Sequence, residues 1–96
     1  MLLQLSDDYY VESNKEYGLG RPDITVIPKD PTKQGFIIEL KRNNINENKS
    51  AEILADEALK QIDEMKYVEC INKKATKWLK IGIGYKGKNC ETLFAE

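Results

Sequence analysis

Residues 36 to 42 read FIIELKR, a stretch that is apolar on both faces if it forms a β-strand. Side chains along a strand alternate between the two faces of a sheet. One face would therefore carry three apolar side chains, and the other would carry Ile37, Glu39 and Lys41. A strand that is apolar on both faces is usually a central one, and an unpaired charge there would cost several kcal/mol. We therefore expect this strand to lie inside a sheet, and Glu39 and Lys41 need partners.

The neighbouring segments supply further strands. Residues 8 to 17 mix aromatic, β-branched and polar side chains as a half-exposed strand does, and the glycine-rich GLGRP then reverses the chain. Residues 23 to 28 (DITVIP) form the next strand, and KDPTKQG is a turn. This order predicts an antiparallel meander. Residues 78 to 86 and 90 to 96, joined by GKN, are two more strands.

A helix is expected between the third and fourth strands. The polar loop at 43 to 50 leads into it, Ser50 or Asn48 can cap its first turn, and it runs to about Glu69. At 100° per residue its apolar side chains fall in one arc that faces the sheet: Ala51, Leu54, Ala55, Ala58, Leu59, Ile62 and Met65. The expected order is β-β-β-α-β-β, an α+β fold.

Two pairs of glycines are expected to have different structural roles. Gly18 and Gly20 do not form a phosphate-cradling loop, because no third glycine follows at the right distance and no helix opens there. Gly82 and Gly84 share one face of the strand at 78 to 86, so a helix or a ligand can approach that face closely.

Composition removes several classes of function. The chain has no histidine, which excludes Ser-His-Asp hydrolysis, H-E-x-x-H proteases and nucleases that activate water with an imidazole. Cys70 and Cys90 are too few and too far apart for a zinc site or a disulfide framework, so we expect reduced, buried thiols. A net charge of −1 argues against an avid, sequence-indifferent nucleic-acid binder. Catalysis would have to use carboxylates, lysine or a metal.

Length and charge distribution set the remaining bounds. We expect a single domain over residues 1 to 96. No run of residues approaches the length of a membrane span and the start does not resemble a signal peptide, so a cytoplasmic protein is expected. Lysines gather near the C-terminal end at Lys73, Lys74, Lys77 and Lys80, where they could contact nucleic acid. The alternative is a solvated lysine face.

Asp23 stands at the start of the strand before Glu39, and a tight turn joins the two strands. Across that hairpin the two carboxylates could jointly hold a hard divalent cation. Mg²⁺ suits this arrangement because it prefers oxygen ligands and often uses one or two carboxylates together with substrate phosphate. Lys41, one pleat further along, would lie beside the phosphate and offset developing charge. The alternative is a solvated surface pair of Glu39 and Lys41, worth under about 1 kcal/mol.

An acid after a tight turn, here Asp23, followed by the acid-x-lysine of Glu39 and Lys41, resembles the motif of the PD-(D/E)XK nuclease superfamily. The phrases SNKEYGLGRPDITVIPKD, GFIIELKR, EALKQIDEMKY and KIGIGYKGK extend the resemblance over residues 9 to 90. They are similar to the nuclease-like domain found at the C-terminus of AAA-ATPase-like bacterial proteins. The resemblance implies a restriction-endonuclease-like core, sandwich-like, with a mixed sheet.

The resemblance also implies roles for single residues. It assigns metal binding to the two acids and the catalytic cation to Lys41. It places Gln61 beside these catalytic residues and gives Tyr67 a supporting position, with an ordinary solvated helix residue as the alternative for each. Glu16 is a further candidate acid, and an exposed hairpin glutamate is the alternative.

The family places a helix before the first strand, and residues 1 to 6 offer little of it. We therefore expect a bare apolar sheet face, and with it a homodimer or a partner chain that covers this face. The expected function is Mg²⁺- or Mn²⁺-dependent hydrolysis of phosphodiester bonds in nucleic acid, with DNA as the expected substrate. One alternative is a non-catalytic binding or assembly module that retains the fold. Another is an unrelated α+β interaction domain, in which Asp23 would point away from Glu39.

Overall fold

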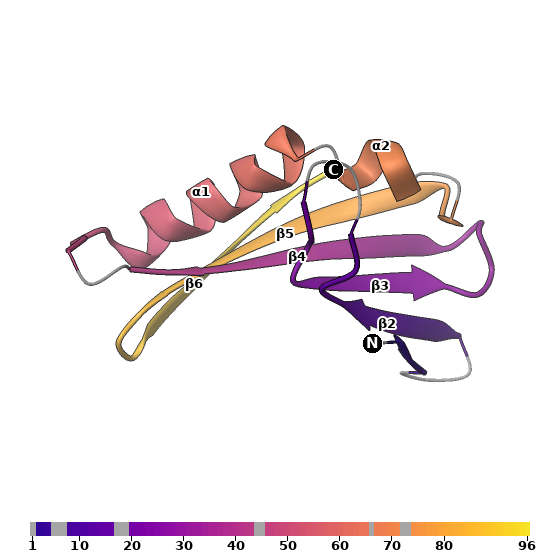
Figure 1. Ribbon diagram of the computed structural model, residues 1–96, viewed down its shortest axis with the longest axis horizontal. Helices are drawn as coiled ribbons and strands as arrows, with labels where there is room; N and C mark the ends of the chain where they lie inside the picture. Colours follow the sequence, from indigo (N-terminus) through magenta and orange to yellow (C-terminus); the bar gives the residue numbers. More distant parts are fainter. Residues whose placement is uncertain (1, 5–7, 17–19, 44–45, 66, 72–73) are drawn as a thin grey trace.

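A computed structural model describes residues 2–4, 8–16, 20–43, 46–65, 67–71 and 74–96. Within these ranges the chain forms one six-stranded sheet and two helices, and α1 lies over one face of the sheet (Figure 1). The elements are β1 (Leu2–Gln4), β2 (Tyr9–Ser13), β3 (Ile24–Pro28), β4 (Gln34–Arg42), α1 (Ala51–Glu64), α2 (Tyr67–Ile71), β5 (Lys77–Lys86) and β6 (Asn89–Ala95).

The sheet is mixed, and its strands follow sequence order from β1 to β6. Strands β1 to β4 pair antiparallel, β4 pairs parallel with β5, and β5 and β6 close an antiparallel hairpin. A parallel pair needs a crossover connection, which α1 supplies. The structure confirms the predicted α+β fold and its antiparallel meander, and it adds β1 as a strand that the sequence did not indicate.

Helix α1 packs directly on β5. Ser50 caps its first turn by accepting a hydrogen bond of 3.2 Å from the Ile53 amide. The predicted apolar arc faces the sheet, with Ala51, Leu54, Ala55, Ala58 and Ile62 buried. A Cβ atom added at Gly82 or Gly84 would lie 2.3 or 2.1 Å from a backbone oxygen of α1. The close approach expected at these glycines is therefore made by the helix.

The prediction of one helix that runs to about Glu69 is correct as far as Glu64 and wrong beyond it. Helix α1 ends at Glu64, and α2 begins at Tyr67. In a continuous helix Tyr67 would lie outside the apolar arc. Because the helix breaks before it, Tyr67 instead faces the core and is 1% exposed. The separate helix thus brings an aromatic residue into the core that the periodicity placed outside it.

The two faces of the sheet differ in their cover. The face under the helices holds the fully buried core, including Ile37, Ile62 and Tyr67. Alternation along the strands places Leu40 and Phe94 on the other face, where they are 39% and 61% exposed. In the described part of the chain, neither helix is long and apolar enough to cross a membrane.

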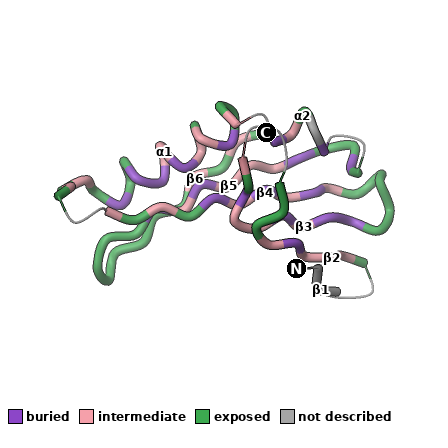
Figure 2. The backbone as a smooth tube through the Cα atoms, in the orientation of Figure 1, coloured by how far each residue is buried: buried purple, intermediate pink, exposed green. Residues whose placement is uncertain are grey.

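The expectation of buried thiols is wrong for Cys90, which is free and exposed. Its strand, β6, is at the edge of the sheet, and this strand and the turn that joins it to β5 are largely exposed (Figure 2). An alternating pattern alone does not distinguish an edge strand from an inner one. The side chain of Cys70 lies outside the described residues.

Candidate active site

Asp23 and Glu39 lie side by side on the face of the sheet that α1 covers. Ile24 of β3 pairs with Ile38 of β4, so Asp23, one residue before β3, comes level with Glu39. The Asp23 carboxyl group hydrogen-bonds to that of Glu39. Asp23 Oδ2 also accepts a 2.8 Å hydrogen bond from the Leu40 amide. The hairpin therefore brings together the two acids that the sequence singled out.

Burial governs the protonation of this pair. Glu39 is 3% exposed, and this burial raises its pKa to about 8, with the hydrogen bond and negative charge of Asp23 adding to the rise. A hydrogen bond with Tyr67 acts in the opposite direction. Two carboxyl groups in contact resist double ionisation unless a cation offsets their charge. In the protein alone, the pair therefore retains a proton at neutral pH.

Two helix residues close over the acids. Gln61 Nε2, on α1, donates to Glu39 Oε2 at 3.4 Å. Tyr67, at the start of α2, makes side-chain hydrogen bonds with both Gln61 and Glu39, and burial together with the charge of Glu39 raises the pKa of its phenol. A Cβ atom at Gly20 would lie 3.1 Å from the Tyr67 hydroxyl, so the segment before β3 passes close to this residue. One polar side chain from each helix thus contacts Glu39.

Lys41 lies one pleat beyond Glu39 on the same face and is more open to solvent. Its side chain is 38% exposed, and its Nζ is 3.8 Å from Oε2 of Glu57 on α1. Glu57 Oε1 also pairs with Lys49 Nζ at 2.7 Å. Sequence reasoning missed Glu57, although its spacing of four from Gln61 places both on one helix face. The site is closed at Glu39 and opens toward Lys41.

The further candidate acid, Glu16, forms an ion pair with an arginine. Glu16 is exposed, and its carboxylate accepts a 3.1 Å hydrogen bond from Arg21. Glu12 of β2, which sequence reasoning did not single out, is 6% exposed and lies opposite Thr25, on the face that carries the acid pair. Its carboxylate pairs with Lys15 at 3.2 Å. A glutamate in a half-exposed strand gives no local sign of such burial.

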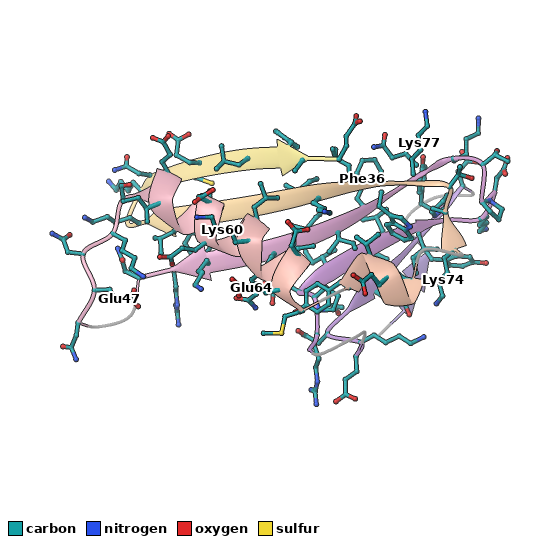
Figure 3. The ribbon with its side chains drawn as sticks, turned by 90° about the horizontal axis from the view of Figure 1, so that it is seen from above. Phe36, Glu47, Lys60, Glu64, Lys74 and Lys77 are labelled. Carbon is teal, nitrogen blue, oxygen red and sulfur yellow. The ribbon has the colours of Figure 1, made fainter. Side chains whose placement is uncertain are left out.

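Two of the lysines proposed for nucleic-acid contact lie far from Lys41. Lys77 begins β5 opposite Gln34, at the start of β4, whereas Lys41 is near the end of that strand. Lys74 and Lys77 lie at one end of the molecule and Glu47 at the other (Figure 3). Lys41 is seven residue steps from Gln34 along β4, which corresponds to about 23 Å.

The other two lysines proposed for nucleic-acid contact are Lys80 and Lys73. Lys80 is on the sheet face that carries Glu39, and it forms an ion pair with Asp63 of α1. Lys73 lies outside the described residues. A nucleic-acid role for these lysines stays a prediction.

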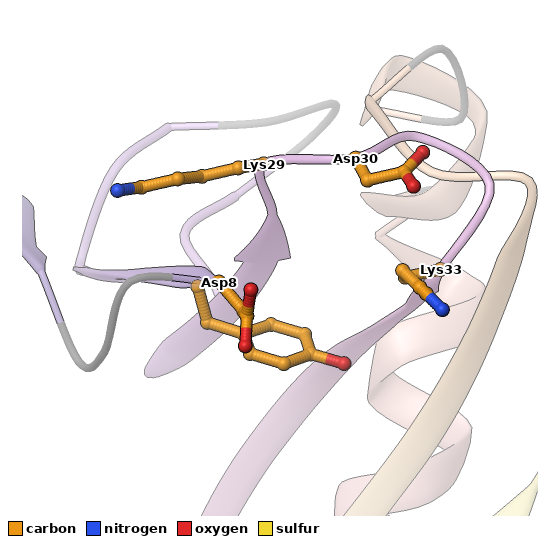
Figure 4. A pocket seen from close by; sticks show the side chains of 5 residues that line it. Asp8, Lys29, Asp30 and Lys33 are labelled. Atoms are coloured by element: carbon orange, nitrogen blue, oxygen red, sulfur yellow. The ribbon is translucent and has the colours of Figure 1, made fainter.

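A second cluster of charged side chains lies at the turn end of the β3–β4 hairpin (Figure 4). It lines a pocket of about 420 Å³ formed by Asp8, Tyr9, Lys29, Asp30 and Lys33. Asp30 accepts hydrogen bonds from the amide and hydroxyl of Thr32, and these lower its pKa. Lys29 Nζ lies 5.0 Å from the centre of the Tyr10 ring. Asp30 in this pocket is therefore ionised and exposed, whereas Glu39 is buried in contact with Asp23.

The acid pair fits a hard divalent cation. It offers carboxylate oxygens, which Mg²⁺ and Mn²⁺ prefer, and a cation would offset the charge that deprotonation of Glu39 creates beside Asp23. Within the described ranges, no group of three or more carboxylate or thiol side chains could hold a metal ion. Two carboxylates alone would leave most coordination positions to water and phosphate, an arrangement that Mg²⁺ often adopts.

Comparison with known families gives one match over nearly the whole chain. A sequence model of the PD-(D/E)XK nuclease superfamily matches residues 1–94, a range that includes Asp23, Glu39 and Lys41. Searches of curated proteins and of solved structures found no significant match.

Proposed function

The chain belongs to the PD-(D/E)XK nuclease superfamily, and on that premise we propose that it is a divalent-metal-dependent nuclease whose substrate is DNA. Its mixed sheet with a helical crossover between β4 and β5 is consistent with a restriction-endonuclease-like domain. The observation that carries the proposal is the buried contact between Asp23 and Glu39, with Lys41 on the same face one pleat away.

The two acids would hold Mg²⁺ or Mn²⁺. When bound, such a cation polarises a phosphate oxygen and increases the acidity of a water molecule. The Leu40 amide fixes one oxygen of Asp23, and Gln61 fixes one oxygen of Glu39. Tyr67 adds a hydrogen bond to Glu39 and excludes water from the buried side of the pair. These contacts would hold one oxygen of each carboxylate in place.

Lys41 would act on the phosphate itself. A positive charge placed beside the phosphate offsets the negative charge that develops on its oxygens in the transition state. The ammonium group is 3.8 Å from Glu57 and its side chain is more than one-third exposed, so it can turn to a phosphate at little cost. Glu57, held also by Lys49, would keep Lys41 near the site between turnovers.

A second candidate is a binding or assembly module that retains the nuclease fold without turnover. The pair between Lys41 and Glu57 favours it, because a lysine engaged by a carboxylate is less available to a phosphate. An unrelated interaction domain, in which Asp23 would point away from Glu39, is not supported, since the two side chains are in contact.

The proposal includes a partner and a setting. The half-exposed apolar face of the sheet, with Leu40, Tyr85 and Phe94 as its most exposed large side chains, supports a homodimer or a partner chain that covers it. A cytoplasmic setting is part of the proposal.

A metal-titrated cleavage assay on single-stranded DNA, duplex DNA and RNA tests the proposal. At low salt, where weak phosphate contacts persist, we expect wild-type protein to cut DNA with Mg²⁺ or Mn²⁺ and to stop on chelation. Asp23→Asn should be inactive, and Asp30→Asn, a matched change at the turn end of the hairpin, should be fully active. Folded wild-type protein that cuts none of these substrates with either metal would leave the non-catalytic module as the better account.

A further inference from the structure

The two edges of the sheet are unequal. Strand β1 is a three-residue edge, and short edge strands are one way in which proteins avoid pairing with other chains. Strand β6 at the other edge has seven residues, contains neither proline nor lysine, and is largely exposed. Figure 3 shows β6 along the outer border of the molecule, with β5 on its inner side. In the described ranges no strand pairs with its outer edge, which leaves a template for another strand.

We propose that a second copy of this chain pairs with β6, so that the two β6 strands run antiparallel and join both sheets into one. This pairing is a contact between copies separate from one that would cover the apolar face, and it does not depend on catalysis. Strand β6 spans Asn89–Ala95, so the register with full overlap places Thr92 opposite Thr92 of the second copy. The joined sheet would lengthen the open apolar face rather than cover it.

The charges favour this register. Lys88 stands one residue before β6 and Glu96 one residue after it, and both are exposed. With Thr92 on the symmetry axis, each Lys88 faces a Glu96 of the other copy, and the symmetry makes two such pairs. Threonine opposite threonine is also a favourable cross-strand pair. A register centred on Glu91 would place two glutamates opposite each other, which is unfavourable.

The apolar residues of β6 are also complementary. Phe94 is 61% exposed and lies on the open face, because it pairs with Ile81 across β5 and paired residues share a face. Cys90 pairs with Tyr85 and has the same orientation. In the proposed register each Phe94 faces a Cys90 of the other copy. Two aromatic rings that are now exposed would thus gain a partner side chain.

The helices leave room for this pairing. Helix α1 crosses β5 at Gly82 and Gly84, whose partners on β6 are Leu93 and Glu91, on either side of Thr92. The two β5 strands would be three strand spacings apart, or about 14 Å. Packed helices need about 8 to 10 Å between their axes, so two copies of α1 fit side by side without a clash.

The pairing has a consequence for the proposed reaction. Residues paired across antiparallel strands point to the same face, so both acid pairs would lie on one face of the joined sheet. Five strand spacings, or about 24 Å, would separate the two β4 strands. The two-fold symmetry of such a dimer matches the two antiparallel strands of a DNA duplex. This consequence rests on the proposed nuclease function, and it favours duplex DNA as the substrate.

Disulfide cross-linking tests the register directly. In a background where Cys70 and Cys90 are replaced by serine, Thr92→Cys should form a covalent dimer on mild oxidation. Opposed residues of an antiparallel pair have Cα atoms about 5 Å apart, within the range of a disulfide. Glu91→Cys and Leu93→Cys are the controls, because each would lie about 8 Å from its own copy and should cross-link far less.

A charge exchange tests the same register without cysteines. Lys88→Glu or Glu96→Lys alone should weaken self-association by about tenfold, and the double variant should restore it. Sedimentation across a micromolar concentration series gives the readout. A wild-type protein that stays monomeric throughout would overturn the inference, as would a dimer whose strongest cross-link is not at position 92. Cleavage by a monomer would leave the nuclease proposal standing, and a cross-linked dimer that cuts nothing would leave the β6 pairing standing.

Discussion

Acids and lysines stand at both ends of the β3–β4 hairpin, yet the two ends give them opposite properties. At the open end, Asp23 contacts Glu39 beneath α1, and burial raises the pKa of Glu39 to about 8. At the turn end, Asp30 is exposed, and hydrogen bonds from Thr32 lower its pKa. The same kind of side chain therefore has its pKa shifted in opposite directions along one hairpin.

The cover over each end explains the difference. Gly82 lies beside Glu39 in the sheet and lets α1 approach closely enough for Gln61 to reach the carboxylate. At the turn end, the carboxylate of Asp30 is satisfied by Thr32, its own near neighbour in the chain. A charged cluster becomes a candidate site when helix packing buries it, and the motif alone does not provide that burial.

The largest effect is expected at the lysines. Lys41→Met should lower the rate of cleavage by about 10² to 10³, because it removes a positive charge aimed at the transition state. Lys33→Met, which removes a lysine at the turn end, should leave the rate unchanged. Single-turnover cleavage of labelled duplex DNA measures both rates. Equal rates for the two variants would show that the covered end has no special electrostatic role.

A change to the cover itself should have the next largest effect. Gly82→Ala places a Cβ atom 2.3 Å from the Ala55 carbonyl oxygen, so α1 must move away from the sheet. We expect a loss of about 1 to 3 kcal/mol in the free energy of unfolding, measured in urea. The pKa of Glu39 should fall toward its usual value as water enters. Gly87→Asn is the control, since a Cβ atom there meets nothing within 4 Å and asparagine tolerates its φ of 59°.

The pH dependence of stability should have opposite signs at the two ends. From about pH 4.5 to about pH 8, Glu39 holds its proton in the folded state and loses it in the unfolded chain. The stability of the metal-free protein should therefore fall with rising pH across this window, by up to about 1.4 kcal/mol per pH unit. Asp30, with its lowered pKa, adds stability above its usual pKa of 3.8 that is lost as pH falls through the folded value.

Two variants separate these contributions. Thermal unfolding is followed from about pH 4 to about pH 9. Stability should fall with rising pH in wild type and in Asp30→Asn, and this fall should be absent in Glu39→Gln. A slope that persists in Glu39→Gln would assign the titration to another group.

The smallest effect is expected at the tyrosine that supports Glu39. Tyr67→Phe removes a hydrogen bond that lowers the pKa of Glu39, so this pKa should rise further. Divalent-metal binding should shift to higher pH and weaken by about tenfold at neutral pH. Tyr10→Phe, beside Lys29 at the turn end, is the matched control and should bind metal as wild type does. Tighter binding by Tyr67→Phe would contradict this role.

Local sequence patterns predicted most of the fold and the central contact. Alternation placed Glu39 and Lys41 on one face, and the short turn after β3 indicated that Asp23 would lie across from Glu39. Ser50 was recognisable as a cap, and helical periodicity identified the buried arc of α1. These features depend on residues close in sequence, where strand and helix geometry leaves few choices.

Features that depend on tertiary packing were not predictable in this way. The burial of Tyr67 requires the break between α1 and α2, and the contact of Glu57 with Lys41 requires the crossing angle of the helix. The exposure of Cys90 follows from the position of β6 at the sheet edge. Strand β1 has three residues, too few for an alternating pattern to stand out.

Calorimetric titration with Mg²⁺ and Mn²⁺ tests the central claim that α1 turns the acids at the covered end into a cation site. The account predicts that wild type binds a divalent cation and releases a proton at neutral pH, detectable as a dependence of the heat on the buffer. Asp23→Asn should lose this binding, and Asp30→Asn should retain it. Wild-type affinity no tighter than millimolar, or equal loss in the two variants, would contradict the account.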